Sequence, residues 1–404
     1  MTTAVEIDIR ERAAQRFEQL GWPTPRLEEW KYTNFAPVAQ VEWKSDDAPQ
    51  PIDSPATLAG RATLELQFVN GVLVASSGDS NLRGGERPTV ADWERNALIA
   101  LNAMHSKDGA RIEVAAGTVV EGFIHLLFIG HGDGIWSHPR NVITVGANAQ
   151  VTVVETYVGS GSYFTNSVTE IVAGDGAVVD HYRVVCESLD AFHYGHVAMQ
   201  QERGSNVTSR SILIGGSIVR SEVMAALAGE GATVTLDGLF AATGTQHHDN
   251  RTVVDHIKPH CDSTQLYKGV LDQNARGIFD GRIIVRPDAQ KTNSRQTNRN
   301  LLLSESAVVD SRPNLEIHND DVKCSHGSTI GQIDEEALFY LRSRGIADEE
   351  ARSLLVYAFA SEMVDRMTVE PVAEQIRRAL FRSMPERLPE RRAEGREPRA
   401  ERKS

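Results

Sequence analysis

The segment 320–327 contains two side chains that could bind a transition metal. It reads DDVKCSHG, with Cys324 and His326 two residues apart. On an extended backbone both side chains leave from one face. A thiol and an imidazole suit iron or an Fe–S cluster, and with a third, orienting group they could instead form a nucleophile pair. Two ligands cannot close a four-coordinate site, so a metal here would be shared with another chain or a substrate. A buried cysteine beside a histidine that caps the end of the fold is the structural alternative.

A second group of candidates lies between residues 246 and 261. Imidazoles and thiols of this kind bind zinc or iron. No known ligand spacing matches, however, and two adjacent histidines point to opposite sides of a strand. The segment therefore predicts structural or groove-lining side chains, with a standalone metalloprotein as an alternative. Its members are His247, His248, His256, His260 and Cys261.

Composition and missing motifs exclude several classes of function. The chain has 404 residues and a net charge of −13, which argues against binding to nucleic acid. Three cysteines do not make a disulfide scaffold and fit a reducing cytosol. No P-loop, dinucleotide fingerprint or nucleophile elbow occurs, so we expect no bound nucleotide. Without a secretory leader or a long apolar run, we expect a cytoplasmic protein that does not enter the membrane.

The first 107 residues predict a mixed, mainly helical region. Residues 11–20 place apolar side chains on one helical face, and Gly21 ends the helix. Residues 64–69 alternate like a strand, and Asn70-Gly71 turns the chain back into residues 72–74, as in a hairpin. Residues 93–104 are helical in pattern.

Residues 108–332 have the pattern of many short strands. Runs rich in Val, Ile and Thr are separated by turns, and turns of similar sequence begin at Gly146, Gly174, Gly204 and Gly229, which are 28, 30 and 25 residues apart. A period of this length indicates a repeat architecture. With strands inside each repeat, the sequence predicts a parallel β-helix, and a β-sandwich or barrel is the alternative.

Residues 333–384 predict a helical domain, followed by a basic, disordered tail over 385–404. Asp334 is a plausible N-cap. One apolar stripe contains Leu354, Leu355, Phe359 and Met363, and the next contains Val369, Val372, Ile376 and Leu380. Because an open β-helix exposes unpaired strand edges, we expect helical regions at both ends of the chain to cover them.

Five stretches of the sequence resemble a known family. The longest is PNLEIHNDDVKCSHGSTIGQIDEEALFYLRSRGI over residues 313–346. The others are GWPTPRLEEWKYT (21–33), YKGVL (267–271), GIFDG (277–281) and QTNRNLLL (296–303). They resemble the SufB/SufD family of Fe–S cluster assembly scaffolds, and within it the SufD side. The resemblance covers nearly the whole chain apart from the basic tail.

The resemblance implies a mainly β fold, a right-handed parallel β-helix between helical regions. It implies a non-enzymatic scaffold in a complex with SufB and two copies of the ABC-type ATPase SufC, where a nascent iron-sulfur cluster forms at the interface with SufB. The family's cluster-site histidine falls on His326, and a nearby cysteine on Cys324. SufB has a ligand cysteine where this chain has Ser304 and a glutamate where it has Gly327, so the chain alone should be a poor scaffold. For the isolated chain, a homodimer is the alternative assembly.

The ATPase is expected to dock on the C-terminal helical domain, around Leu338, Phe339, Leu354 and Phe359. A β-helix enzyme acting on carbohydrates is the competing hypothesis. It predicts a secretion signal, an aromatic ladder and paired carboxylates along a groove, and neither the signal nor an obvious ladder is present in the sequence.

Overall fold

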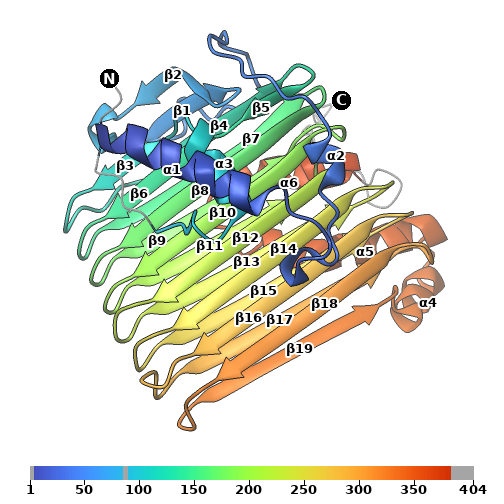
Figure 1. The fold of residues 1–404 in the computed structure, drawn as a ribbon. Coiled ribbons are helices and arrows are strands. Elements are labelled where there is room, and N and C mark those ends of the chain that lie inside the picture. The colour runs from blue at the N-terminus through green and yellow to red at the C-terminus, as the bar shows by residue number, and fades with distance from the viewer. Residues whose placement is uncertain (1–3, 85–89, 384–404) are drawn as a thin grey trace, which may run out of the picture.

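The computed structural model describes residues 4–84 and 90–383, and its centre is a parallel β-solenoid built from two facing sheets (Figure 1). The chain passes back and forth between the sheets, so that consecutive strands belong to opposite sheets through most of the molecule. This confirms the prediction of a parallel β-helix. The predicted basic tail, 385–404, lies outside the described residues.

Each sheet is a continuous ladder of strands. Sheet A is 9-stranded and runs in the order β3 (Arg111–Val114), β6 (Arg140–Val145), β8 (Tyr163–Ala173), β10 (Phe192–Gln201), β12 (Ile218–Leu227), β14 (His247–His256), β16 (Arg276–Val285) and β18 (Val308–Ile317), with β5 (Ile135–Ser137) beside β8. Sheet B is 10-stranded and runs in the order β2 (Val72–Gly78), β1 (Leu64–Val69), β4 (Ile124–His131), β7 (Gln150–Ser160), β9 (Val178–Cys186), β11 (Asn206–Leu213), β13 (Thr233–Ala242), β15 (Asp262–Leu271), β17 (Asn293–Leu302) and β19 (Lys323–Gly331).

The repeated turns of the sequence form one column along the solenoid. In each turn one residue adopts the left-handed conformation: Asn148 (φ 57°), Gly176 (φ 66°), Gly204 (φ 63°) and Gly231 (φ 71°). The backbone N–H of that residue donates to the next turn, as from Asn148 to the Asp175 carbonyl at 2.8 Å. Glycine and asparagine tolerate this conformation best, which explains the recurring composition.

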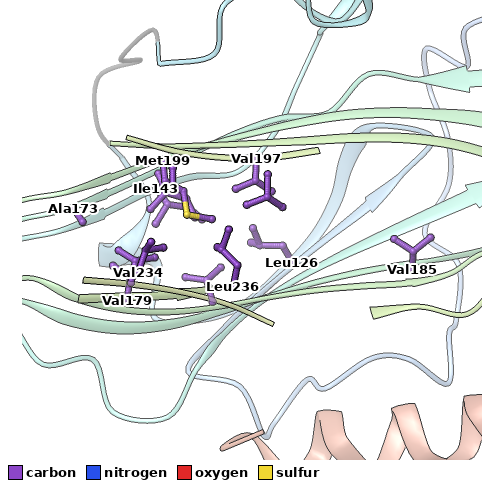
Figure 2. Packing of buried hydrophobic residues seen from close by; sticks show 14 of the residues in the cluster. Leu126, Ile143, Ala173, Val179, Val185, Val197, Met199, Val234 and Leu236 are labelled. Carbon is purple, nitrogen blue, oxygen red and sulfur yellow. The ribbon is translucent and has the colours of Figure 1, made fainter. Parts of the chain in front are cut away.

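Side chains from both sheets fill the space between them (Figure 2). Val179 and Leu236 of sheet B meet Val197 and Met199 of sheet A, and all are at most 1% exposed. Full burial of one such side chain contributes about 1.5–3 kcal/mol. Small residues occupy the position after each left-handed turn residue, and all are fully buried: Ala149, Ala177, Ser205, Ala232 and Cys261.

The N-terminal helices α1 (Ala4–Leu20), η1 (Glu28–Trp30), α2 (Ala36–Ala39) and α3 (Ala97–His105) pack on the outside of sheet A (Figure 1). The Trp30 ring lies 3.7 Å from the guanidinium carbon of the buried Arg220. The predicted hairpin is confirmed, and its strand β1 also pairs in parallel with β4. The first 107 residues therefore contribute strands to the solenoid as well as helices. A further turn, η2 (Ser80–Leu82), follows the hairpin.

The C-terminal helices α4 (Glu335–Ser343), α5 (Asp348–Val364) and α6 (Glu370–Ser383) follow β19. Asp334 caps α4, as predicted, by accepting hydrogen bonds from the backbone N–H groups of Glu336 and Ala337. Helices α5 and α6 lie on the outside of sheet B. There the ammonium of Lys268 donates to the Phe359 carbonyl at 2.7 Å and to Glu362 at 2.6 Å. Among the described residues, no helix is both long enough and apolar enough to span a membrane.

One expectation about these helices is wrong. Helices α5 and α6 cover the face of sheet B, where they contact β13 and β15, and they do not cover the edge strand β19. The physical reason is that their apolar stripes match the apolar outer face of the middle strands, with residues such as Ile212, Leu239 and Val270. Burial of apolar area, rather than pairing of the strand edge, determines where they lie.

Candidate functional site

The solenoid ends in two edge strands. β18 is the last strand of sheet A and β19 the last strand of sheet B, and no described strand pairs with their outer edges. Most residues of β19 are exposed, and Val308, Ile317 and Ile330 are 47%, 43% and 52% exposed. Unpaired edges with exposed apolar side chains are ready to pair with another chain. We call this region, β18 and β19, the open end.

Cys324 and His326 both lie on β19 of the open end. Their register partners on β17 are Ser294 and Gln296, both of which are buried between the sheets. Since side chains in the same register of parallel strands share a face, Cys324 and His326 both point toward the interior of the last turn. The structure therefore brings the two predicted ligands onto one face, about 7 Å apart along the strand.

The two side chains differ in their surroundings. Cys324 is half-buried and packs against the buried cluster of Ile283, Val285 and Ala289. Burial raises the pKa of its thiol, although a hydrogen bond from the Ser294 backbone opposes this. A thiol in such surroundings is protonated at neutral pH and is a weak ligand.

His326 is exposed. Its backbone belongs to the ladder between β17 and β19, but within residues 4–84 and 90–383 its imidazole takes part in no hydrogen bond or ion pair. Its imidazole is therefore available to a ligand. No described group of three or more His, Cys, Asp or Glu side chains is arranged to hold a metal ion. If the open end holds a metal, ligands from outside the described residues must complete the site.

Ser304, which the family resemblance aligns with a cysteine, lies at the other end of β17 from Ser294. It occupies the turn between β17 and β18, and its hydroxyl donates to the Gln273 carbonyl at 2.7 Å. Of the acidic residues before Cys324, Asp321 pairs with Lys291 at 2.8 Å across the last turn. These side chains stabilise turns and do not face the interior at His326.

The His247–Cys261 segment is distributed along one strand and one turn. The imidazole of His247 faces the N-terminal segment, with Nε2 2.9 Å from the Thr33 hydroxyl, whereas His248 points inward and lies 3.1 Å from the Gly215 carbonyl. Burial lowers the pKa values of His248 and His256 to about 4. His260 is a left-handed turn residue, and Cys261 occupies the small-residue column of the turns. These side chains do not converge.

The four residues expected to bind the ATPase have different environments. Leu338 is 1% exposed and belongs to the interior, whereas its neighbour Phe339 is 73% exposed and Tyr340 is 57% exposed. Leu354 and Phe359 are half-buried, and the Lys268 ammonium lies 4.0 Å from the centre of the Phe359 ring. Within this chain, α4 thus presents two adjacent aromatic side chains to solvent.

A groove of about 700 Å³ lies on the outside of sheet A. Two of the carboxylates deep in this groove are paired with arginines: Asp280 with Arg251 at 3.2 Å and Glu316 with Arg282 at 2.6 Å. The described residues that line it include no Phe, Tyr or Trp. A sugar-cleaving site needs unpaired carboxylates and profits from aromatic stacking, so the groove does not favour a carbohydrate-active enzyme.

The sequence interpretation missed a network of charged side chains inside the early turns. Glu155 accepts hydrogen bonds from Tyr157 at 2.8 Å and from His181 at 3.3 Å, and it pairs with Arg183. All are buried. A signal was available, because residues 181 and 183 have the same strand parity as the inward Val179 and Val185.

Known proteins of one family are similar to this chain over most of its length. Residues 128–359, more than half of the chain, match the family model of the SufBD core domain of SUF-system FeS cluster assembly. The chain is 30% identical over 394 residues to the iron-sulfur cluster assembly protein SufD of Escherichia coli, covering 93% of each protein. A SufBD family protein of Synechocystis is 30% identical over 412 residues, or 93% of this chain and 91% of the relative. Protein ABCI7, chloroplastic, of Arabidopsis thaliana is 28% identical over 405 residues, or 91% of this chain and 84% of the relative.

Proposed function

Since this chain belongs to the SufBD family of SUF-system Fe–S cluster assembly proteins and is SufD-like, we propose that it is the non-enzymatic scaffold subunit of an ATPase-coupled complex. In this proposal its open end pairs with a SufB subunit, and a nascent iron-sulfur cluster is assembled at the interface. The cluster is the complex's product and passes on to other proteins. His326 on an unpaired edge strand is the observation that carries the proposal.

The open end supports an interface with SufB. Two sheets end there at once, and each offers a row of backbone N–H and C=O groups to a partner strand. The exposed apolar side chains of β18 and β19 would be buried by such a partner. In the absence of SufB, a second copy of this chain is the natural substitute, so we expect the isolated protein to form a homodimer through the open end.

The inward face of β19 supports a shared cluster site. His326 supplies an imidazole nitrogen, a ligand that iron accepts, and the remaining ligands come from SufB. Cys324 lies beside it as an auxiliary group, because its thiol is half-buried and protonated. Because each subunit supplies only part of the ligands, the cluster can be assembled only on the complex. This agrees with the expectation that the chain alone is a poor scaffold.

Helix α4 supports docking of the ATPase. Phe339 and Tyr340 form an exposed aromatic pair immediately after β19, while α5 and α6 anchor the domain to sheet B. In the complex two copies of SufC bind, one of them here, and hydrolyse ATP that this chain does not bind. A change in SufC contacts can then bias the interface near β19. The complex is cytoplasmic in this proposal, with no membrane or nucleic-acid partner.

The test uses the complete complex, co-expressed with SufB and SufC. After anaerobic reconstitution, the parent and His326→Ala complexes are compared for subunit content by mass spectrometry and for cluster content by visible absorbance and iron analysis. We expect an intact His326→Ala complex without cluster. Ser325→Ala, on the opposite face of the same strand, is the matched control and should retain the cluster. Full cluster accumulation in His326→Ala would refute the proposal.

A further inference from the structure

A buried carboxamide lies directly below His326. Gln296 on β17 is the register partner of His326 on β19, one turn deeper in the solenoid, and its side chain is 1% exposed. Within the described residues neither its Oε1 nor its Nε2 has a hydrogen-bond partner. A buried polar group without a partner costs about 1–3 kcal/mol, so its presence needs an explanation.

The facing sheet leaves space for this carboxamide. A Cβ atom at Gly281 on β16 would come within 2.2 Å of the Gln296 Nε2 atom. The backbone at Gly281 is not in the left-handed region, so glycine is needed there for space rather than for conformation. The fold thus accommodates a full-length glutamine at this position.

The neighbours of Gln296 on its own strand are already engaged. The Ser294 hydroxyl is hydrogen-bonded to the Ser263 hydroxyl at 2.6 Å. The side-chain oxygen of Asn298 accepts hydrogen bonds from Ser311 at 2.8 Å and from Asn300 at 2.6 Å. One turn deeper, Gln265 accepts from Thr252 through its Oε1 atom at 2.7 Å, but its Nε2 atom has no partner among the described residues. A carboxamide oxygen can accept two hydrogen bonds, so this Nε2 atom does not exclude a second donor to Gln296. On the other side of Gln296, the adjacent side chain with an N–H to donate is His326.

An earlier turn contains the same arrangement with the bond formed. His181 and Ser209 are register partners on neighbouring strands of sheet B, and they belong to the same inward column as Gln296 and His326. There the His181 Nδ1 atom lies 2.9 Å from the Ser209 hydroxyl. Inward side chains of adjacent turns in this column are therefore close enough for a hydrogen bond to an imidazole.

We propose that Gln296 is a positioning residue for His326. Its carboxamide oxygen accepts a hydrogen bond from one imidazole N–H, which fixes the ring tautomer and leaves the other nitrogen unprotonated and facing the open end. A ligand histidine commonly binds metal with one nitrogen while a neighbour holds the other. The inference rests on the proposed function for the role of His326, but the bond itself is a property of this chain.

The bond is tested on the full-length isolated chain with ¹⁵N-labelled histidine. Long-range ¹H–¹⁵N spectra report the tautomer of each imidazole, and the His326 signals are assigned by their loss in His326→Ala. In the parent we expect one dominant tautomer. Gln296→Met keeps the volume but removes the carboxamide, and the His326 ring should then show the tautomer mixture of a free imidazole.

Two further variants make the result specific. Gln296→Glu keeps an acceptor at the same distance and should restore the single tautomer. Gln265→Met removes an equivalent carboxamide one turn deeper and should leave the His326 signals unchanged. If Gln296→Met does not fold, Gln296→Asn, whose amide is withdrawn by one methylene, replaces it with the same expectation. A tautomer mixture in the parent, or no change in the Gln296 variants, overturns the inference.

Cluster content separates this inference from the proposed function. In the reconstituted complex, Gln296→Met should reduce cluster retention at limiting iron about tenfold or more, as loss of such a support does at other metal sites. If the His326 tautomer changes in Gln296→Met while both Gln296→Met and His326→Ala retain their full cluster content, the hydrogen bond is supported and the cluster site is refuted. An unchanged tautomer would refute the hydrogen bond whatever the cluster content.

Discussion

Two histidines of the same inward column have opposite environments. His181, in an early turn, is fully buried, and its nitrogens lie 2.9 Å from Ser209 and 3.3 Å from Glu155. His326, in the last turn, is exposed, and among the described residues it has no partner. The sequence position within the repeat is equivalent. The difference is that further turns of the solenoid follow His181, whereas none of the described strands follows His326. The His326 imidazole has no partner because the inward column ends at β19.

The comparison extends to the charges around each residue. In the early turns Glu155 and Arg183 are paired inside the solenoid, so the buried polar groups stabilise one another. At the open end the interior side chains on β17 and β19 are uncharged or exposed, and in the proposed complex a partner chain completes them. The polar side chains inside the early turns therefore stabilise the fold, whereas those inside the last turn are left without partners in this chain and can bind a ligand.

The largest expected difference between the two regions is in stability. His181→Ala leaves Glu155 buried with one partner fewer, and we expect the free energy of unfolding to fall by about 3 kcal/mol. His326→Ala removes an exposed side chain and should change it by less than about 0.5 kcal/mol. Urea denaturation of the isolated chain measures both. Equal losses would contradict the distinction between a structural and a binding histidine.

The sequence predicted the solenoid because its turns are local. Gly176 and Gly204 recur where the left-handed conformation is needed, and that requirement is visible without knowing the fold. It predicted Cys324 and His326 on one face for the same reason. The burial of Glu155 and the position of Gln296 below His326 depend on register between strands about 30 residues apart, which no local pattern contains. Amphipathicity likewise predicted the helical stripes but not which surface they cover.

A second difference between the solenoid interior and the open end is how acid affects the stability of the fold. The imidazole of His248 lies inside the solenoid, and burial lowers its pKa from 6.5 to about 4. The unfolded chain therefore binds a proton between pH 6.5 and 4 that the folded chain does not, so stability is present above pH 6.5 and is lost as the pH falls to 4. We expect a loss of about 3 kcal/mol over this range from His248 alone.

The measurement is urea denaturation at several pH values from 7 to 4. His248→Gln should be less stable at pH 7 and should lose correspondingly less stability on acidification. Ser325→Ala, on the exposed face of β19, should keep the parent slope. If the free energy of unfolding of His248→Gln falls with pH as steeply as that of the parent, the pKa of the His248 imidazole is not lowered by burial.

A third prediction tests whether the open-end region continues into α4. Leu338 and Phe339 are adjacent, but one is 1% and the other 73% exposed. Phe339→Ser should weaken binding of the ATPase about tenfold, since exposed aromatic side chains are typical anchors of interfaces, and should leave the melting temperature unchanged. Leu338→Ser should lower the melting temperature. Calorimetric titration of the purified ATPase into each variant measures the affinity, and unchanged binding by Phe339→Ser would place the docking surface elsewhere.

The smallest expected effect is at Cys324. Its side chain packs against the cluster of Ile283, Val285 and Ala289, and burial raises the pKa of the thiol. The thiolate that iron binds is therefore scarce at neutral pH. Cys324→Ala keeps the apolar contacts of the Cβ atom and should therefore reduce cluster content of the reconstituted complex by no more than about twofold. His326→Ala, two residues away on the same face, should abolish it.

We expect the cluster content of the Cys324→Ala complex to exceed that of the His326→Ala complex. Iron content and visible absorbance of the two complexes, prepared in parallel, test this order. Slow alkylation of Cys324 by iodoacetamide in the isolated chain is the independent check, because a protonated, half-buried thiol reacts slowly. A cluster lost as completely in Cys324→Ala as in His326→Ala would mean that pairing with SufB converts the thiol into a thiolate ligand. The last turn would then differ from the early turns in both side chains of its inward face rather than in the histidine alone.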